Sequence, residues 1–233
     1  MYESKLRRHL RYSVSLSMFA ALAYVCVFVL RFKVSFLTLD VKDAVMATGA
    51  LALGPLAGVL ISLVVALLEF ITVSDTGVYG LIMNFLSSMT FTLTASLIYR
   101  FRRSLSGAVL ALVSAALATT SVMMLANLLI TPFYMGVTRE AVIDLIPRLL
   151  LPFNLTKSTL NAAVVLLLYK PLTGALVRAG LMRGLGGRQK GDRARLLTPK
   201  TLLLWGISIL VIAACVTELI LVLGGNFRLF IFK

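Results

Sequence analysis

Long apolar runs separated by short polar breaks dominate the chain. These runs cover approximately residues 13 to 30, 44 to 73, 78 to 99, 105 to 133, 145 to 170 and 201 to 223. About 20 apolar residues are enough for a helix to cross the hydrocarbon core of a bilayer, and most runs reach that length. The sequence lacks the alternating strands and regular turn signals that are typical of a membrane β-barrel. The pattern therefore predicts an integral membrane protein made of spanning helices.

The second run is too long for a single span and contains Gly54-Pro55. Proline is favourable in the first turn of a helix but interrupts a helix interior. We therefore expect a short helix that ends near Leu53 and a second helix that begins at Pro55. The predicted fold class is all-α: a polytopic membrane helical bundle with a six-helix core and a C-terminal seventh transmembrane helix.

These helices divide the chain into three parts. Residues 1 to 175 are expected to form one six-helix membrane domain. Residues 176 to 200 are rich in glycine and basic side chains, and we interpret them as a cytoplasmic linker. Residues 201 to 233 are expected to hold an additional transmembrane helix and a short tail.

Composition and charge favour a membrane location over nucleic-acid binding. The chain is 60% hydrophobic and 14% charged, with a formal net charge of +14. Basic residues gather before the first predicted span, after the fourth, and between the sixth and the seventh. Cytoplasmic loops of membrane proteins carry an excess of lysine and arginine. The distribution thus predicts a multi-pass cell-membrane protein with a cytoplasmic N-terminus and no nucleic-acid partner.

Patterns for covalent chemistry are missing from the sequence. The only histidine, His9, lies in the basic N-terminal tail, and the nine acids are scattered, so we predict neither a catalytic set nor a metal site. The segment GLGGRQKGD at residues 184 to 192 lacks the Lys-Ser/Thr pair of a phosphate loop. Glu69 and Glu218 have no evident basic partner within the spans and are interpreted as solvated helix-end residues. We expect no enzyme activity, no ATP hydrolysis and no cofactor.

One apolar segment, LLPFNLTKSTLNAAVVLLLYKP at residues 150 to 171, carries Asn154, Lys157 and Asn161. Their spacing of i, i+3 and i+7 places them on one stripe of a helix. A charged side chain near the membrane centre costs roughly 2.5 to 3.5 kcal/mol on insertion scales, so such groups face partners, water or a ligand. Two hypotheses stay open: polar contacts that hold helices together, or a ligand site. Lys157 favours the ligand site, because helix packing does not require a charge.

Two further spans offer amides at a similar predicted depth. Asn84 marks one face of the fourth span together with Ser87 and Ser88, and Asn127 lies near the outer end of the fifth. Four aromatic residues lie near the same level: Tyr79, Phe133, Tyr134 and Phe153. They fit an interfacial belt, or stacking against a flat ligand.

Three connections are expected on the outer face, at residues 32 to 43, 72 to 78 and 131 to 147. The first, FKVSFLTLDVKD, is amphipathic and long enough to fold over a site.

Small residues recur every four positions on two stretches of the chain. Ser13, Ser17 and Ala21 do so on the first span, while Ala50, Gly54 and Gly58 do so around the second and third helices. Such stripes allow helices to approach closely. They predict internal packing, or, for the first span, contact with a partner subunit.

Four segments, in this order and spacing, carry a resemblance to a known family. They are FLTLDVKDAV (36 to 45), GALALGPLAGVLISLVVALLEF (49 to 70), TGVYGLIMNFLS (76 to 87) and LPFNLTKSTLNAAVVLLLYKPL (151 to 172). They resemble the riboflavin-specific substrate-binding subunits of energy-coupling factor vitamin transporters, over roughly residues 10 to 175. This chain departs from the family in its seventh span and in the serines of its first-span stripe.

The resemblance implies a six-helix subunit that binds riboflavin at its outer end, beneath the loop between the first two helices. It also implies docking through small-residue surfaces, here Ser13, Ser17 and Ala21, onto a membrane scaffold protein driven by two cytoplasmic ATPases. By the same resemblance Asn127, Asn154 and Lys157 contact the flavin.

Weaker candidates for the site are Thr38 and Leu39 in the loop, Tyr79, and Asn84 from the polar face of the fourth span. Alternatives are a subunit for another vitamin or flat heterocycle, and a membrane assembly subunit whose polar stripe only fixes helix register. A membrane enzyme is the third alternative.

Overall fold

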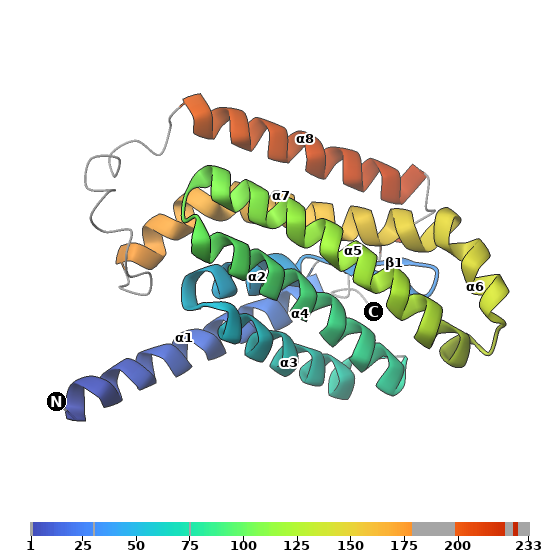
Figure 1. Cartoon of the computed structure of the whole chain (residues 1–233), viewed down its shortest axis with the longest axis horizontal. Helices are drawn as coiled ribbons and strands as arrows, with labels where there is room; N and C mark the ends of the chain where they lie inside the picture. The colour runs from blue at the N-terminus through green and yellow to red at the C-terminus, as the bar shows by residue number, and fades with distance from the viewer. Residues whose placement is uncertain (1, 30, 75, 179–198, 222–225, 228–233) are drawn as a thin grey trace.

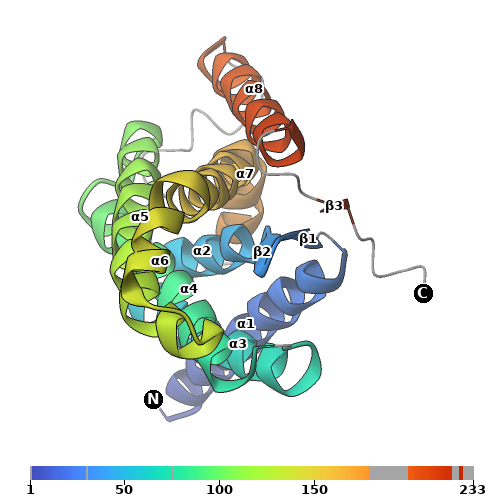
Figure 2. The same ribbon diagram turned by 90° about the vertical axis from the view of Figure 1, so that its right-hand side faces the viewer.

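The computed structural model describes residues 2–29, 31–74, 76–178, 199–221 and 226–227. Its elements are α1 (Tyr2–Val29), β1 (Arg31–Val34), β2 (Leu37–Asp40), α2 (Lys42–Leu53), α3 (Pro55–Thr72), α4 (Gly77–Phe101), α5 (Leu105–Met135), α6 (Arg139–Leu145), a π-helical segment (Ile146–Leu150), α7 (Leu151–Arg178), α8 (Pro199–Leu221) and β3 (Asn226–Phe227). Figures 1 and 2 show a helical bundle with α8 lying along α7. The predicted membrane bundle with an extra C-terminal helix is confirmed.

Six of the described helices have the length and apolar composition to cross a membrane. These spans are His9–Phe28, Pro55–Thr72, Gly77–Phe101, Leu105–Met135, Arg139–Tyr169 and Thr201–Leu221. The short helix α2, with 12 residues, packs among α1, α3, α4 and α7. It ends where the sequence predicts, because Gly54 adopts φ 108° and Pro55 opens α3.

The predicted connection at residues 131 to 147 is wrong in extent. Helix α5 continues to Met135 and ends at Gly136, which adopts a left-handed φ of 64°. Helix α6 then starts at once, capped by the Thr138 hydroxyl, which accepts a hydrogen bond from the Ala141 amide. Pro147 lacks an amide proton and lies in the π-helical segment that joins α6 to α7.

The loop predicted at residues 32 to 43 is a β-hairpin followed by the start of α2. Strands β1 and β2 pair antiparallel, with Val34 opposite Leu37 and Arg31 opposite Asp40. The alternation of polar and apolar residues that makes this segment amphipathic is the period of a strand, so Thr38 and Leu39 of β2 point to opposite faces.

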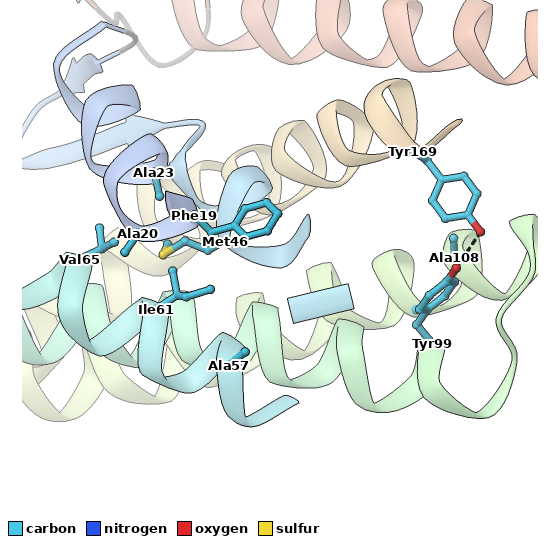
Figure 3. Close-up of a cluster of buried hydrophobic side chains, with 11 residues drawn as sticks. Phe19, Ala20, Ala23, Met46, Ala57, Ile61, Val65, Tyr99, Ala108 and Tyr169 are labelled. Atoms are coloured by element: carbon cyan, nitrogen blue, oxygen red, sulfur yellow. Dashed lines mark hydrogen bonds between the residues drawn. The ribbon is translucent and has the colours of Figure 1, made fainter. Parts of the chain in front are cut away.

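Small side chains allow the helices to pack closely around α2. Figure 3 shows Phe19 and Ala23 of α1 against Met46 of α2, with Ile61 and Val65 of α3 on the same cluster. A second cluster joins α2 to α4, α5 and α7 and consists of Ala44, Ala47, Phe91, Ala95, Leu112, Ala115, Ala162 and Val165. These two clusters fix the helices that carry the polar residues described below.

Most of the predicted linker, namely residues 179 to 198, lies outside the described residues. The glycine-rich segment at residues 184 to 192 and the basic residues around it also lie outside the described residues.

Candidate binding site

A cavity of about 280 Å³ lies at the end of the bundle that carries the β1–β2 hairpin. The hairpin and helices α1, α3, α4, α5 and α7 all contribute to its wall, as does the turn between α3 and α4. Its volume is close to the lower end of the range of about 300 to 1,000 Å³ found for small-molecule sites.

The structure brings six of the seven predicted ligand residues to this cavity. They are Thr38, Tyr79, Asn84, Asn127, Asn154 and Lys157. Leu39 is the exception: its side chain is completely buried in a cluster with Val34 and Phe153. Successive residues of a strand face opposite sides, so Thr38 lines the cavity and Leu39 packs behind it. The prediction of Leu39 as a side-chain contact has no support from this placement.

Lys157 has protein acceptors of its own. Its Nζ lies 3.4 Å from the Asp40 carboxylate and 3.4 Å from the Thr38 carbonyl oxygen. The Asp40 carboxylate of β2 compensates this ammonium, so the charge of Lys157 does not by itself require a ligand. Both contacts are long for charge-assisted hydrogen bonds, and an ammonium has three protons to donate. Lys157 thus retains the capacity to donate to a ligand in the cavity.

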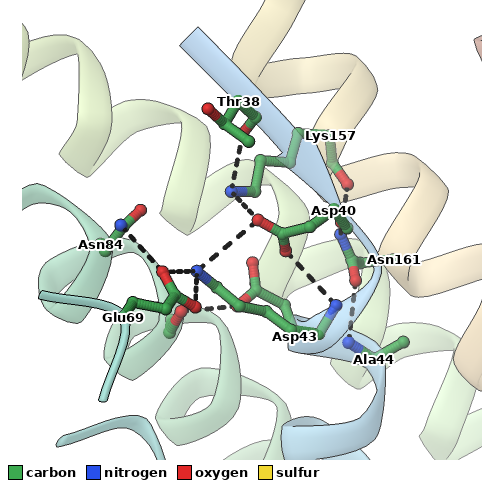
Figure 4. Close-up of polar contacts among 10 residues, drawn as sticks. Thr38, Asp40, Asp43, Ala44, Glu69, Asn84, Lys157 and Asn161 are labelled. Atoms are coloured by element: carbon green, nitrogen blue, oxygen red, sulfur yellow. Dashed lines mark hydrogen bonds and ion pairs between the residues drawn. The ribbon is translucent and has the colours of Figure 1, made fainter. Parts of the chain in front are cut away.

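Glu69 was expected to be solvated and unpaired, and the structure corrects this. Its two carboxylate oxygens accept hydrogen bonds from Lys42 Nζ at 2.6 and 2.7 Å, and its side chain is buried. Asn84 Nδ2 donates to Glu69 Oε2 at 3.0 Å, and Asp40 lies 3.6 Å from Lys42 Nζ. Figure 4 shows Glu69 of α3 and Asn84 of α4 converging with Asp40 of β2, which also faces Lys157 of α7.

Lys42 is not among the predicted site residues, because it falls in the predicted connection at residues 32 to 43. The available signal was the charged pattern Asp40, Lys42, Asp43 directly before an apolar helix. Asp43 is buried as well and accepts a 2.6 Å hydrogen bond from Ser88. Burial raises the pKa of the Asp40 carboxyl, but the nearby ammonium groups of Lys157 and Lys42 lower it by more, so this pKa lies below its usual value.

The asparagines of the stripe have different roles. Asn161 is completely buried, does not line the cavity and bonds within the protein: its Oδ1 accepts from the Ala44 amide at 2.8 Å, and its Nδ2 donates to the carbonyl oxygens of Asp40 and Lys157. Through the bond to the Ala44 amide, Asn161 of α7 holds the start of α2 against α7. Asn154 Nδ2 donates to Leu150 O at 2.8 Å, and no described residue donates to its Oδ1.

Asn127 is buried on α5 and keeps both ends of its amide within that helix. Its Nδ2 donates to Met123 O at 2.7 Å, and its Oδ1 accepts from Thr131 at 2.9 Å. An amide nitrogen has two protons and an amide oxygen has two lone pairs, so each end keeps one position for a ligand.

Aromatic side chains gather along the cavity wall. The Tyr134 ring lies 6.5 Å from Tyr79 and 6.4 Å from Phe36, and Phe153 lines the same cavity. Phe133, in contrast, is 69% exposed and points away, as expected for an interfacial belt. The wall therefore combines amides, carboxylates and one ammonium with flat apolar surfaces.

Comparisons with known proteins agree on one family. The family described as "ECF transporter, substrate-specific component" matches residues 11–172. The chain belongs to this family. The resemblance found in the sequence is thereby confirmed, and the family is one of transporter components rather than enzymes.

Two relatives show how much of this substrate-specific component, or S component, is shared with other proteins. The riboflavin transporter RibU of Staphylococcus aureus is 31% identical over 174 residues, which cover 71% of this chain and 92% of the relative. A solved structure described as the S component of a bacterial ECF transporter matches with a TM-score of 0.63 and 29% identity, over 72% of this chain and 98% of the other. Helix α8 of this S component lies beyond the family match, which ends at residue 172.

The two small-residue stripes of the S component lie in different surroundings. Gly58 packs inside the bundle, where an added Cβ would lie only 2.8 Å from the Ala50 side chain. Ser13, Ser17 and Ala21 are all exposed on the side of α1 that faces away from the bundle. The stripe around Gly58 therefore serves internal packing, while the stripe of Ser13, Ser17 and Ala21 is accessible to a partner. Among the described residues, no cluster of histidine, cysteine and acidic side chains is suited to hold a metal ion.

Proposed function

We propose that this chain is the riboflavin-binding subunit of an ATP-driven uptake transporter. Its cavity faces the exterior and captures riboflavin there, and the subunit delivers the vitamin to the cytoplasm together with a membrane scaffold protein and two ATPases. The observation that carries the proposal is the convergence of Asn127, Asn154 and Lys157 on one cavity with aromatic walls. The riboflavin transporter of Staphylococcus aureus, at 31% identity, supports the choice of ligand.

The chemistry of the wall suits a flavin. An asparagine amide presents a donor and an acceptor, which match the alternating C=O and N–H groups at the pyrimidine edge of an isoalloxazine ring. The aromatic rings of Tyr79, Tyr134 and Phe153 offer flat surfaces for the tricycle. Lys157 donates to carbonyl or ribityl oxygens, while Asp40 and Glu69 accept from ribityl hydroxyl groups. Riboflavin can therefore interact with the amides, the aromatic rings, the ammonium and the carboxylates of the cavity.

We also propose the arrangement that this function requires. The N-terminus lies in the cytoplasm, residues 1 to 175 form the substrate-binding domain, and residues 176 to 200 link it to the last helix. The exposed stripe of Ser13, Ser17 and Ala21 provides the docking surface for the scaffold protein, because small side chains permit close approach of another helix.

Equilibrium titration of the detergent-purified full-length chain tests the proposal. We expect saturable one-site quenching of riboflavin fluorescence, and flavin absorbance in protein purified from cells grown with the vitamin. Thiamine and adenine are the competitors that represent other flat heterocycles, and we expect neither to displace riboflavin. Displacement by one of them would identify a different ligand class, and the absence of any saturable binding would favour an assembly subunit.

A further inference from the structure

Helix α8 packs against two of the elements that line the candidate cavity, the β1–β2 hairpin and α7. Its residues Cys215 and Leu219 share one buried cluster with Val34 and Leu39 of the hairpin and with Phe153 and Leu160 of α7. Since α8 lies outside the region that the family match covers, this contact is an addition to the common core.

The cluster lies directly behind the cavity wall. Thr38 lines the cavity, and the next residue, Leu39, faces α8 through the cluster. Phe153 belongs to both the cavity wall and the cluster. A movement of the hairpin away from α7 and α8 would therefore break up this cluster.

A polar contact joins α8 to the same part of α7. Thr156 donates a 2.8 Å hydrogen bond to Glu218 Oε2, and Thr156 lies between the cavity residues Asn154 and Lys157 in sequence. Glu218 was expected to be solvated, but it is partly buried and bound to this hydroxyl. The bond fixes the turn of α7 that presents the predicted ligand residues.

The chain segment after α8 also reaches the hairpin. Strand β3 pairs antiparallel with β1, with Phe32 opposite Phe227 and Lys33 opposite Asn226, so the sheet has the order β2-β1-β3. Figure 2 shows β3 beside β1. A two-stranded hairpin is only marginally stable by itself, and a third strand and a packed face stabilise it.

We propose that Leu219 and Glu218 of α8 are positioning residues for the binding cavity, which hold the β1–β2 hairpin and the Asn154–Lys157 turn in place and so slow the release of ligand. The inference rests on the proposed riboflavin binding for its kinetic part. Its structural part, the restraint of the hairpin by α8, holds without any ligand.

Stopped-flow fluorescence on the full-length protein measures the kinetic part. Leu219→Ala removes the α8 side chain from the cluster, and Leu210→Ala is the matched control because Leu210 is 71% exposed on the same helix. We expect Leu219→Ala to release riboflavin about tenfold faster, while its association rate stays within about twofold of the unmodified protein. We expect Leu210→Ala to leave both rates unchanged. Equal release rates in Leu219→Ala and the unmodified protein would overturn the proposal.

Hydrogen exchange of the ligand-free proteins measures the structural part. In Leu219→Ala we expect faster deuterium uptake at residues 31 to 40, with unchanged uptake in α3 and α4. Uptake that rises everywhere to the same degree would show general destabilisation and contradict a positioning role. If Leu219→Ala does not fold, Glu218→Ala supplies the same two measurements through loss of the bond to Thr156. If the unmodified protein does not bind riboflavin, the proposed function fails, while hydrogen exchange still decides the restraint by α8.

Discussion

Lys42, the first residue of α2, places its Nζ 2.6 and 2.7 Å from the two carboxylate oxygens of Glu69 on α3. Both side chains are buried, and Glu69 also accepts a hydrogen bond from Asn84. The pair and Asn84 therefore connect three helices at the cavity wall, which Glu69 and Asn84 line. Removal of only one partner of a buried ion pair strongly destabilises a folded protein, because the remaining buried charge has no compensation.

Removal of one member of this pair will destabilise the protein. We expect Lys42→Met to lower the free energy of unfolding by about 3 to 5 kcal/mol, because Glu69 keeps a buried charge without its main partner. The double variant Lys42→Met/Glu69→Leu serves as the control and should recover most of the loss. Thermal unfolding of the ligand-free proteins in detergent is the measurement. A single variant as stable as the unmodified protein would show that the pair has no role in stability.

The predicted ligand residues on α7 will control affinity. We expect Asn154→Ala and Lys157→Ala each to weaken riboflavin binding by about 1 to 3 kcal/mol, or roughly ten- to hundredfold in Kd, because each removes a hydrogen bond in a buried site. Leu155→Ala is the matched control, since Leu155 is 42% exposed on the same helix and does not line the cavity. Isothermal or fluorescence titration gives the three affinities. Unchanged affinity in both cavity variants would remove these residues from the site.

Stability will depend on the ionisation of Asp40 at low pH. The pKa of Asp40 is lowered from its ordinary value of 3.8, so the folded protein favours the ionised carboxylate. This contribution is complete above pH 3.8 and is lost as the pH falls below that value through the lower pKa of the folded state. We expect the difference in melting temperature between the unmodified protein and Asp40→Asn to be constant near neutral pH and to narrow as the pH drops through this window. A difference that stays constant down to pH 3 would contradict the assignment.

The exposed stripe on α1 will affect transport without affecting ligand binding. We expect Ala21→Trp to lower riboflavin uptake in cells and co-purification with the scaffold protein at least severalfold, because a bulky side chain blocks close helix approach. Its Kd for riboflavin should not change, since Ala21 is exposed on α1 and does not line the cavity. Val14→Trp is the control, because Val14 is 67% exposed on the same helix but lies outside the stripe. Equal uptake by both variants would exclude the stripe as the docking surface.

The spanning helices could be predicted from the sequence because apolar run length is a local property. The break at Gly54-Pro55 could be predicted for the same reason, since it depends on the backbone preferences of two adjacent residues. Helix α6 was missed because its seven residues lie between two long apolar runs and are stabilised by a cap at Thr138 rather than by length. The hairpin was predicted as an outer loop, and its pairing only became visible in the structure.

The polar residues of the cavity could be predicted, but their partners could not. Asn84, Asn127, Asn154 and Lys157 stand out as polar groups within apolar runs. Lys157 meets Asp40 across 117 positions of sequence, and Lys42 meets Glu69 across 27. Nothing local specifies which acid meets which ammonium, because that choice follows from how the helices pack.

Far from the cavity, α4 and α7 are joined by a hydrogen bond of 2.8 Å between the hydroxyl groups of Tyr99 and Tyr169. Their rings meet edge to face in the buried core, as Figure 3 shows. The same two helices present Asn84 and Asn154, each 15 residues earlier in its helix, roughly 22 Å nearer the hairpin end at a rise of about 1.5 Å per residue. This hydrogen bond thus holds α4 and α7 together at the end of the bundle opposite the hairpin. Any exit route that opens between α4 and α7 at that end has to break the bond between the two tyrosines.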